Sequence, residues 1–303
     1  MTTLQDLVSE SKRHLLSQQR EPLNKLQTTI TNSATTLAFT YDLTSLQAQS
    51  YVEIDLEVMY VWSVDASAKT AVVERAQVGS VAAAHSAGAV VRVNPKFPDF
   101  AIVKALNDDL ADLSSPANGL FAVRTVDITS SGSKVGYDLT GTTGLIDIIE
   151  VRYDERGGYR SWPVVPSWSL ARGVDATAFA SGLTLNLHSG PTSGRTVNVL
   201  YKGAFSPLVN LSDDVLTVAG LPLTAHDLPP LGAAMRLVAP REIKRSFPEA
   251  QGEPRRAQEV PPGAVGGSYR GLMQLRATRI QSEANRLVAH YPTRHQMTAP
   301  ASW

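Results

Sequence analysis

The chain has 303 residues and no cysteine, and its 28 basic side chains balance its 28 acidic ones, so the formal net charge is zero. The absence of cysteine excludes disulfide-stapled folds, thiolate metal sites and a thiol nucleophile. The zero sum conceals two opposed parts: residues 1–240 hold 18 basic and 23 acidic side chains, a net charge of −5, whereas residues 241–303 hold 10 and 5, a net charge of +5. We therefore predict a mildly acidic body with a basic C-terminal segment.

Neither a targeting segment nor a membrane span is visible in the sequence. The first residues run into the basic stretch at Lys12 and Arg13 without the apolar core of a signal peptide. No apolar run approaches the roughly 18 residues that a membrane span needs. We therefore expect a protein that is made in the cytoplasm and has no membrane partner.

The patterning predicts an α+β fold in which antiparallel β modules, one small and one like a sandwich or barrel, combine with amphipathic helices and an extended C-terminal arm. An N-terminal helix is expected within residues 1–22, where Thr3 can cap it together with Asp6. Alternating and β-branched residues over 23–95 predict the small β module. Its strands are expected near 36–41, 51–54, 58–64, 70–75 and 90–93.

Residues 96–119 contain the clearest amphipathic helix, since Pro98 and Asp99 form a good helix start and apolar residues follow at spacings of three and four. Strand-like segments separated by glycine-rich turns then predict an antiparallel β domain over 120–225. Its strands are expected near 120–128, 145–153, 159–165, 183–188 and 196–202.

The last part of the chain alternates helices with segments of low apolar content. A helix is predicted at 226–245, a Pro/Gly-rich arm or loop at 246–268, a C-terminal helix at 269–291 and a tail at 292–303. The arm carries few apolar side chains and cannot bury enough surface to order itself alone.

No pattern in the sequence spells out a reaction, so we expect no catalytic, cofactor or metal site and no enzymatic activity. The six histidines form no H-x3-H or H-E-x-x-H pair, which argues against a zinc site. The stretch 190–194 resembles a nucleophile elbow only loosely, because strands are expected on both sides of it. It is interpreted as a hairpin turn.

The most informative constellation is a stripe of basic side chains on the C-terminal helix. The helix places its apolar residues on one side and the basic stripe about 100° around from them. The stripe has three interpretations: contact with an acidic helix of a neighbouring copy, contact with DNA phosphates, or a solvated face. The subunit contact would use Asp108, Asp109, Asp112, Arg276, Arg279, Arg286, Met273, Ile280 and Leu287. The DNA-facing alternative would use Arg276, Arg279, Arg286 and His290.

The β domain at 120–225 supports one further alternative, a carbohydrate-binding module. Its aromatic residues Tyr159, Trp162 and Trp168 lie within ten positions and could form a stacking platform. The same residues could equally serve as core or interface anchors.

Several stretches resemble a small β module that recurs in virion proteins of tailed bacteriophages. The stretches are 51–54, 57–61, 70–75 and 82–91, which reads Ala-Ala-Ala-His-Ser-Ala-Gly-Ala-Val-Val. The helix that starts near Phe97 is similar to the helix after which many phage neck proteins enter a β domain. The order of elements resembles head-to-tail connector (adaptor) proteins, in which a terminal arm contacts a neighbour or the portal.

The resemblance implies a structural virion protein at the head–tail junction, made in the host cytoplasm. Its implied partners are further copies of itself in a ring, the portal protein, tail or neck proteins and packaged DNA in the passage that the ring lines. The β module is shared among virion components, so a minor tail or baseplate protein is the alternative. A ring needs two unlike faces on each subunit, and the separated charges predict salt-dependent association.

Overall fold

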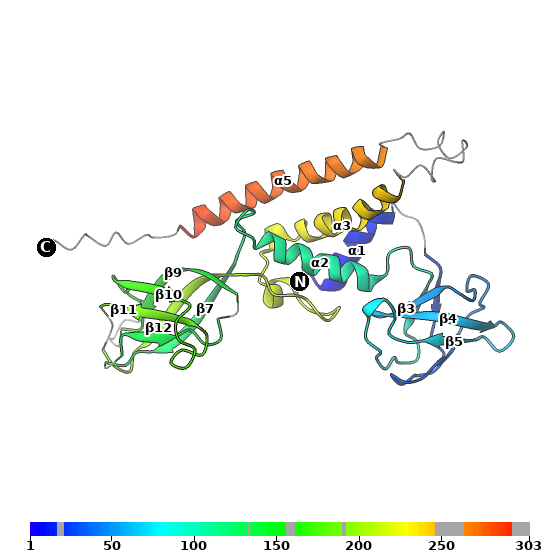
Figure 1. Cartoon of the computed structure of the whole chain (residues 1–303), viewed down its shortest axis with the longest axis horizontal. Coiled ribbons are helices and arrows are strands. Elements are labelled where there is room, and N and C mark those ends of the chain that lie inside the picture. The colour runs from blue at the N-terminus through cyan, green and yellow to red at the C-terminus, as the bar shows by residue number, and fades with distance from the viewer. Residues whose placement is uncertain are drawn as a thin grey trace.

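The computed structural model describes residues 1–16, 21–132, 134–142, 144–155, 161–189, 192–245 and 264–292. The fold is α+β, as predicted, with a helical centre between two antiparallel β units. The helices are α1 (Leu4–Leu16), α2 (Asp99–Leu113), α3 (Leu228–Arg245) and α5 (Ala264–His290). Figure 1 shows the strands β3 to β5 at one end of the molecule and the strands β7 to β12 at the other.

The first β unit, called the β module below, is a curled six-stranded antiparallel sheet with the order β1-β6-β3-β4-β5-β2. Its strands are β1 (Leu23–Lys25), β2 (Thr36–Ala38), β3 (Tyr51–Ile54), β4 (Glu57–Asp65), β5 (Thr70–Glu74) and β6 (Val90–Val93). Alternation along β3 turns Val52 and Ile54 into the core and leaves Tyr51 partly exposed. Phe39 and Met59 fill the same core.

The second β unit consists of two three-stranded antiparallel sheets, with the orders β7-β12-β9 and β10-β11-β8. Its strands are β7 (Ala122–Thr129), β8 (Gly136–Asp138), β9 (Leu145–Tyr153), β10 (Trp168–Arg172), β11 (Leu183–Leu187) and β12 (Thr196–Gly203). Leu139, Val151, Leu185 and Val199 lie fully buried in a core to which both sheets contribute. Two sheets around one core agree with the predicted sandwich-like domain.

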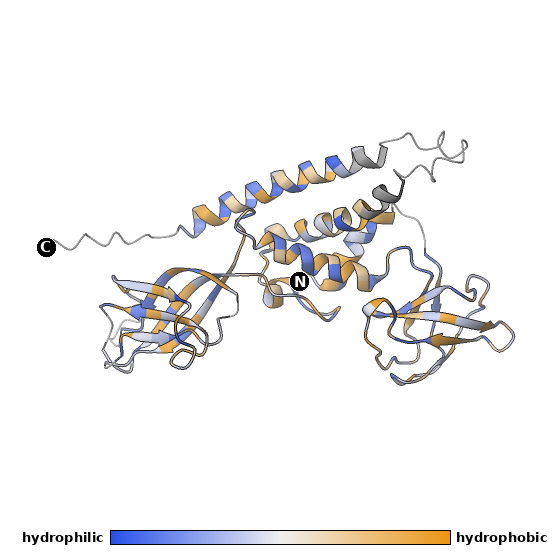
Figure 2. Cartoon of the chain, viewed as in Figure 1, coloured by the Kyte–Doolittle hydropathy of each residue, from blue (hydrophilic) through white to orange (hydrophobic). Residues whose placement is uncertain are grey.

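The helical centre has its own core, to which α1, α2, α3 and the π-helical turn η2 (Val215–Ala219) contribute. Leu4, Leu106, Leu110 and Leu228 are fully buried there. Thr3 begins α1 as predicted: its backbone N–H and its hydroxyl both donate to Asp6 Oδ2, at 2.8 and 2.9 Å. Polar and apolar residues alternate along the helices in Figure 2, as an amphipathic pattern requires.

The crossing of α2 and α3 depends on a glycine. A Cβ atom at Gly232 of α3 would lie 1.9 Å from Oδ1 of Asp109 on α2, a distance that no real contact shows. Only the bare backbone of glycine lets the two helices approach this closely with the Asp109 carboxylate between them.

The structure differs from the predicted elements at several places. Helix α5 begins at Ala264, so residues 264–268 belong to the helix and not to the arm. Over the described part of 159–165 there is no strand, only the isolated bridges of Ser161 with Glu155 and Val164 with Arg152. The rest of the arm at 246–263 and the tail at 293–303 lie outside the described residues. No described helix is long and apolar enough to cross a membrane.

Candidate functional site

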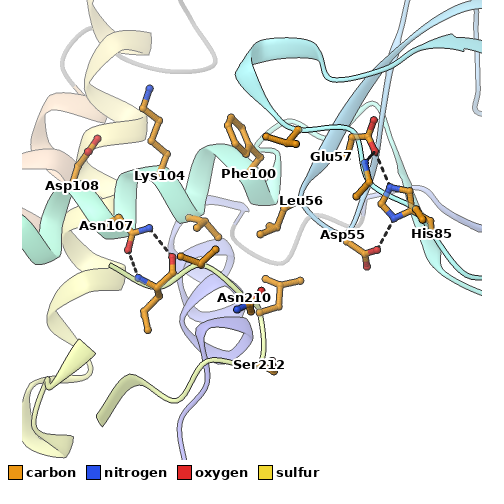
Figure 3. A pocket seen from close by; sticks show the side chains of 17 residues that line it. Asp55, Leu56, Glu57, His85, Phe100, Lys104, Asn107, Asp108, Asn210 and Ser212 are labelled. Atoms are coloured by element: carbon orange, nitrogen blue, oxygen red, sulfur yellow. Dashed lines mark hydrogen bonds and ion pairs between the residues drawn. The ribbon is translucent and has the colours of Figure 1, made fainter. Parts of the chain in front are cut away.

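A groove of about 780 Å³ lies where the β module meets the helical centre. Three segments line it: the turn after β3 with the stretch 81–85, one side of α2, and the segment 208–212. Figure 3 shows Leu56 and Phe100 facing the groove from the module and from α2. Its wall is mainly apolar, which suits an apolar side chain of a ligand or partner.

Asn107 holds the outer wall of the groove in place. Its side-chain oxygen accepts the Leu208 N–H at 2.8 Å, and its side-chain nitrogen donates to the Leu208 carbonyl at 2.8 Å. In Figure 3, Asn107 points to the 208–212 segment, while Lys104 and Asp108 project from α2 away from that segment. The groove is therefore anchored on α2 and presents charged groups at its rim.

A buried charge cluster around Glu57 supports the module side of the groove. Glu57 is 1% exposed, and its carboxylate accepts two bonds from the Arg75 guanidinium, at 2.6 and 2.7 Å. It also accepts the N–H groups of Ala76 and Ala83. Burial by itself would raise the pKa of Glu57, but these bonds and one from His85 lower it to about 2.

His85 lies between two carboxylates and completes this cluster. Its Nδ1 lies 2.8 Å from Asp55 Oδ2, and its Nε2 lies 2.9 Å from Glu57 Oε2 (Figure 3). Burial opposes the charged imidazolium, yet the hydrogen bonds to Asp55 and Glu57 outweigh it and raise the pKa of His85. Both ring nitrogens therefore contact carboxylates, and the imidazole links the turn after β3 to the stretch 81–85.

A second charge cluster, called the module joint below, fixes the β module to α1 and α2. Glu53 of β3 accepts the N–H groups of Asp99 and Phe100 at 2.8 Å each, so the module supplies the cap that Pro98 cannot. The Asp99 carboxylate in turn pairs with Lys12 of α1 at 2.6 Å and with Arg92 of β6 at 2.9 Å. Three elements from separate parts of the chain therefore meet at one buried group.

The module joint places two carboxylates, those of Glu53 and Asp99, close enough for their negative charges to repel each other. Burial, and next the charge of Asp99, raise the pKa of Glu53 to about 7, although the two capping N–H groups act in the opposite direction. Glu53 and Asp99 are both at most 2% exposed. Lys12 and Arg92 supply the positive charges that offset the two carboxylates.

The structure brings the predicted acidic and basic residues of α2 and α5 together within one chain. Arg276 Nη2 lies 2.7 Å from Asp109 Oδ1 and 3.1 Å from Asp112 Oδ2. Burial raises the pKa of Asp109 to about 6, although Arg276 and Arg236 oppose the shift. From the sequence we expected this pairing between neighbouring copies. The structure shows the pairing within one chain, so a contact between copies stays a prediction.

The other predicted residues divide into paired, buried and exposed groups. Arg279 pairs with Asp227 at 2.8 Å, and Arg286 pairs with the buried Glu283 of its own helix. Ile280 and Leu287 pack into the core of the helical centre. The remaining three are exposed: Met273, His290 and Asp108, of which Asp108 lines the groove. For the DNA-facing alternative, this means that the three arginines already contact carboxylates of their own chain.

Of the aromatic residues proposed as a carbohydrate platform, the structure describes Trp162 and Trp168. Trp168 packs against the core of the second β unit, while Trp162 is 42% exposed. Tyr159 lies outside the described residues. The anchoring role is the better interpretation of Trp168.

Sequence reasoning singled out neither Glu53 nor Glu57. A signal existed: acids at 53, 55 and 57 recur at every second position across a strand and its turn, where alternation should bury some of them. No group of three or more metal-ligating side chains that could hold a metal ion occurs among the described residues. No protein-family model matches the chain, and no curated protein matches it.

Proposed function

We propose that the chain is a structural protein of a tailed-phage virion, the subunit of a head-to-tail connector ring that joins portal and tail and lines the DNA passage. The observation that supports this best is the architecture: a helical centre with a β unit at each end, the order of elements on which the resemblance to adaptor proteins was based. The virion location and the absence of enzymatic activity belong to the same proposal.

The architecture suits a ring subunit for a physical reason. Head-to-tail contact around a closed ring is heterologous, so each subunit needs two different surfaces. The two ends of this molecule are built differently, one from the curled β module and the other from the two packed sheets. The module joint then fixes the β module on the helices, so that the angle between neighbouring subunits is defined.

Gold-labelled antibodies against the purified chain, applied to intact virions, test the location. Label at the junction of head and tail is the expected result. Label at the tail tip would contradict the connector and favour a minor tail or baseplate protein. Absence of the chain from purified virions by mass spectrometry would overturn the structural role altogether.

Light scattering on the purified chain tests the ring separately. A closed oligomer of defined mass is expected. A chain that remains monomeric at the highest soluble concentration, with and without the portal protein, would contradict the ring.

A further inference from the structure

Helix α5 rests on a polar seat. The seat, as used below, consists of Asp109, Asp112, Gly119, Thr224 and Asp227, which lie on or next to α2 and before α3. Arg276 and Arg279 of α5 donate to the three carboxylates, and Thr224 donates to Glu283 at 2.6 Å. The described buried side chains of α5 are Ile280, Glu283 and Leu287, so the buried apolar contact that holds the helix on its seat comes from Ile280 and Leu287.

Several described positions of α5 face away from the rest of the chain. A Cβ atom added at Gly267 or Gly271 would meet no other atom within 4 Å. The apolar side chains of Met273, Leu275 and Val288 are 54, 51 and 59% exposed. Among the described side chains of α5, those that are not exposed lie along one stripe of the helix, from Tyr269 and Leu272 to Leu287.

The connection to α5 is longer than the packing requires. Helices α3 and α5 lie side by side and run in opposite directions in Figure 1, and helix pairs of this kind are commonly joined by about 2–8 residues. Here 18 residues, 246–263, separate the end of α3 from the start of α5. A chain of that length can span up to roughly 60 Å, which exceeds the length of α5 itself, about 40 Å.

We propose that α5 is an exchangeable helix: within the ring, α5 of one copy occupies the seat on the next copy. The proposal rests on the ring proposed above and identifies the contact that closes it. The basic residues Arg276 and Arg279 would meet the same three acids in a second copy as in their own chain. Because the contacts are identical in both arrangements, exchange requires only that the seat open and that the connection reach.

The cysteine-free chain allows a direct test. A Cβ atom at position 119 would lie 3.9 Å from Ala284 Cβ, which is within the range for a disulfide. Two single variants, Gly119→Cys and Ala284→Cys, are co-expressed with tags of different size and oxidised. If α5 is exchanged, a covalent heterodimer is the main product. Each single variant oxidised alone is the control, and it should stay uncrosslinked.

The double variant Gly119→Cys/Ala284→Cys detects the opposite result, in which α5 stays on the seat of its own chain. A covalent monomer from the double variant, with no heterodimer from the mixed singles, overturns the exchange. Light scattering on the same samples separates the failure of the exchange from the failure of the ring. An oligomer with intrachain links contradicts the exchange of α5 but agrees with a ring. A monomer contradicts both the exchange and the ring.

Gly119 has a positive φ of 69° that disfavours cysteine, so Gly119→Cys can misfold. A second pair of cysteine variants at other positions keeps the test valid in that case. Asp227→Cys and Arg279→Cys, joined by a short bifunctional maleimide, replace an ion pair of 2.8 Å. The same expectation applies to this pair: links between copies support the exchange, and links within one chain overturn it.

Discussion

Gly232 is the residue at which packing of the helical centre is least tolerant. Gly232→Ala would normally favour a helix by about 1 kcal/mol. Here the added Cβ would collide with the Asp109 carboxylate, and overpacking of this kind costs about 1–3 kcal/mol. We expect a net loss in the free energy of unfolding, measured by urea denaturation. Gly271→Ala on α5, which has open space, is the control and should be neutral or stabilising.

Glu57 is the residue on which the buried cluster of the β module depends. Glu57→Gln removes the charge that Arg75 and His85 face, and loss of one partner from a buried ion pair costs about 3–5 kcal/mol. The midpoint of urea unfolding should fall accordingly. Glu74→Gln, on the exposed side of β5, should change the unfolding free energy by no more than about 0.5 kcal/mol. Equal effects of the two variants would show that the cluster contributes nothing.

The raised pKa of Glu53 makes the protein less stable as pH rises. The folded-state pKa of about 7 lies above the ordinary value of 4.5, so the folded state binds more protons between these values. The free energy of unfolding should therefore fall as pH rises from about 4.5 to about 7. Asp109 and His85, whose pKa values are also raised, act in the same direction.

Denaturation of the wild type and of Glu53→Gln at pH 5 and pH 8 measures this contribution. The difference in unfolding free energy between the two pH values should be smaller in Glu53→Gln, because its side chain does not titrate. Glu74→Gln should retain the wild-type difference. A Glu53→Gln variant with an unchanged difference would assign the pH dependence to Asp109 and His85 alone.

At the scale of elements, the contrast within α5 gives the next prediction. Ile280 is buried against the helical centre, whereas Met273 on the same helix is 54% exposed. Ile280→Ala should cost about 2–5 kcal/mol in the contact of α5 with its seat. Hydrogen exchange of α5 amides should then accelerate, while Met273→Ala leaves it unchanged. Equal protection in both variants would mean that α5 is held by its ion pairs alone.

Elements with a strong local period were predictable from the sequence, and those defined by distant partners were not. The spacing in α2 and the alternation around β3 and β4 located these elements closely. The short strands β1 and β8 have three residues each, too few for alternation to show, and exist because a neighbouring strand pairs with them. The start of α5 was missed because its glycines suggested a loop.

The candidate site also combines contacts suggested by spacing along the chain with contacts that depend on distant partners. One interpretation of the stripes on α2 and α5 paired Asp109 and Asp112 with basic residues of a neighbouring copy, and the structure shows Arg276 of the same chain there. The meeting of Glu53 with the amide of Asp99 joins residues 46 positions apart and follows from how the module sits on α2. No spacing along the chain encodes that contact, so sequence reasoning could not identify the module joint.

At the scale of the whole molecule, the contacts of α5 with its seat change the effect that we expect salt to have on assembly of the proposed ring. The sequence predicted association that weakens with salt. The Arg279–Asp227 pair has side chains 33 and 46% exposed, so dissolved ions screen it. If α5 is exchanged, however, the same pairs exist before and after association. Salt should then change how fast copies exchange α5 more than how much ring forms.

Copies carrying two different fluorophores, mixed at roughly 50 and 500 mM NaCl, measure this rate by energy transfer, because the Debye length shortens about threefold over that range. We expect faster mixing at high salt, since screening weakens the pairs that must open. Arg279→Gln should mix faster at low salt and respond less to added salt, because its pair is already absent. A wild-type mixing rate that does not change with salt would show that opening of the α5 seat does not limit subunit exchange.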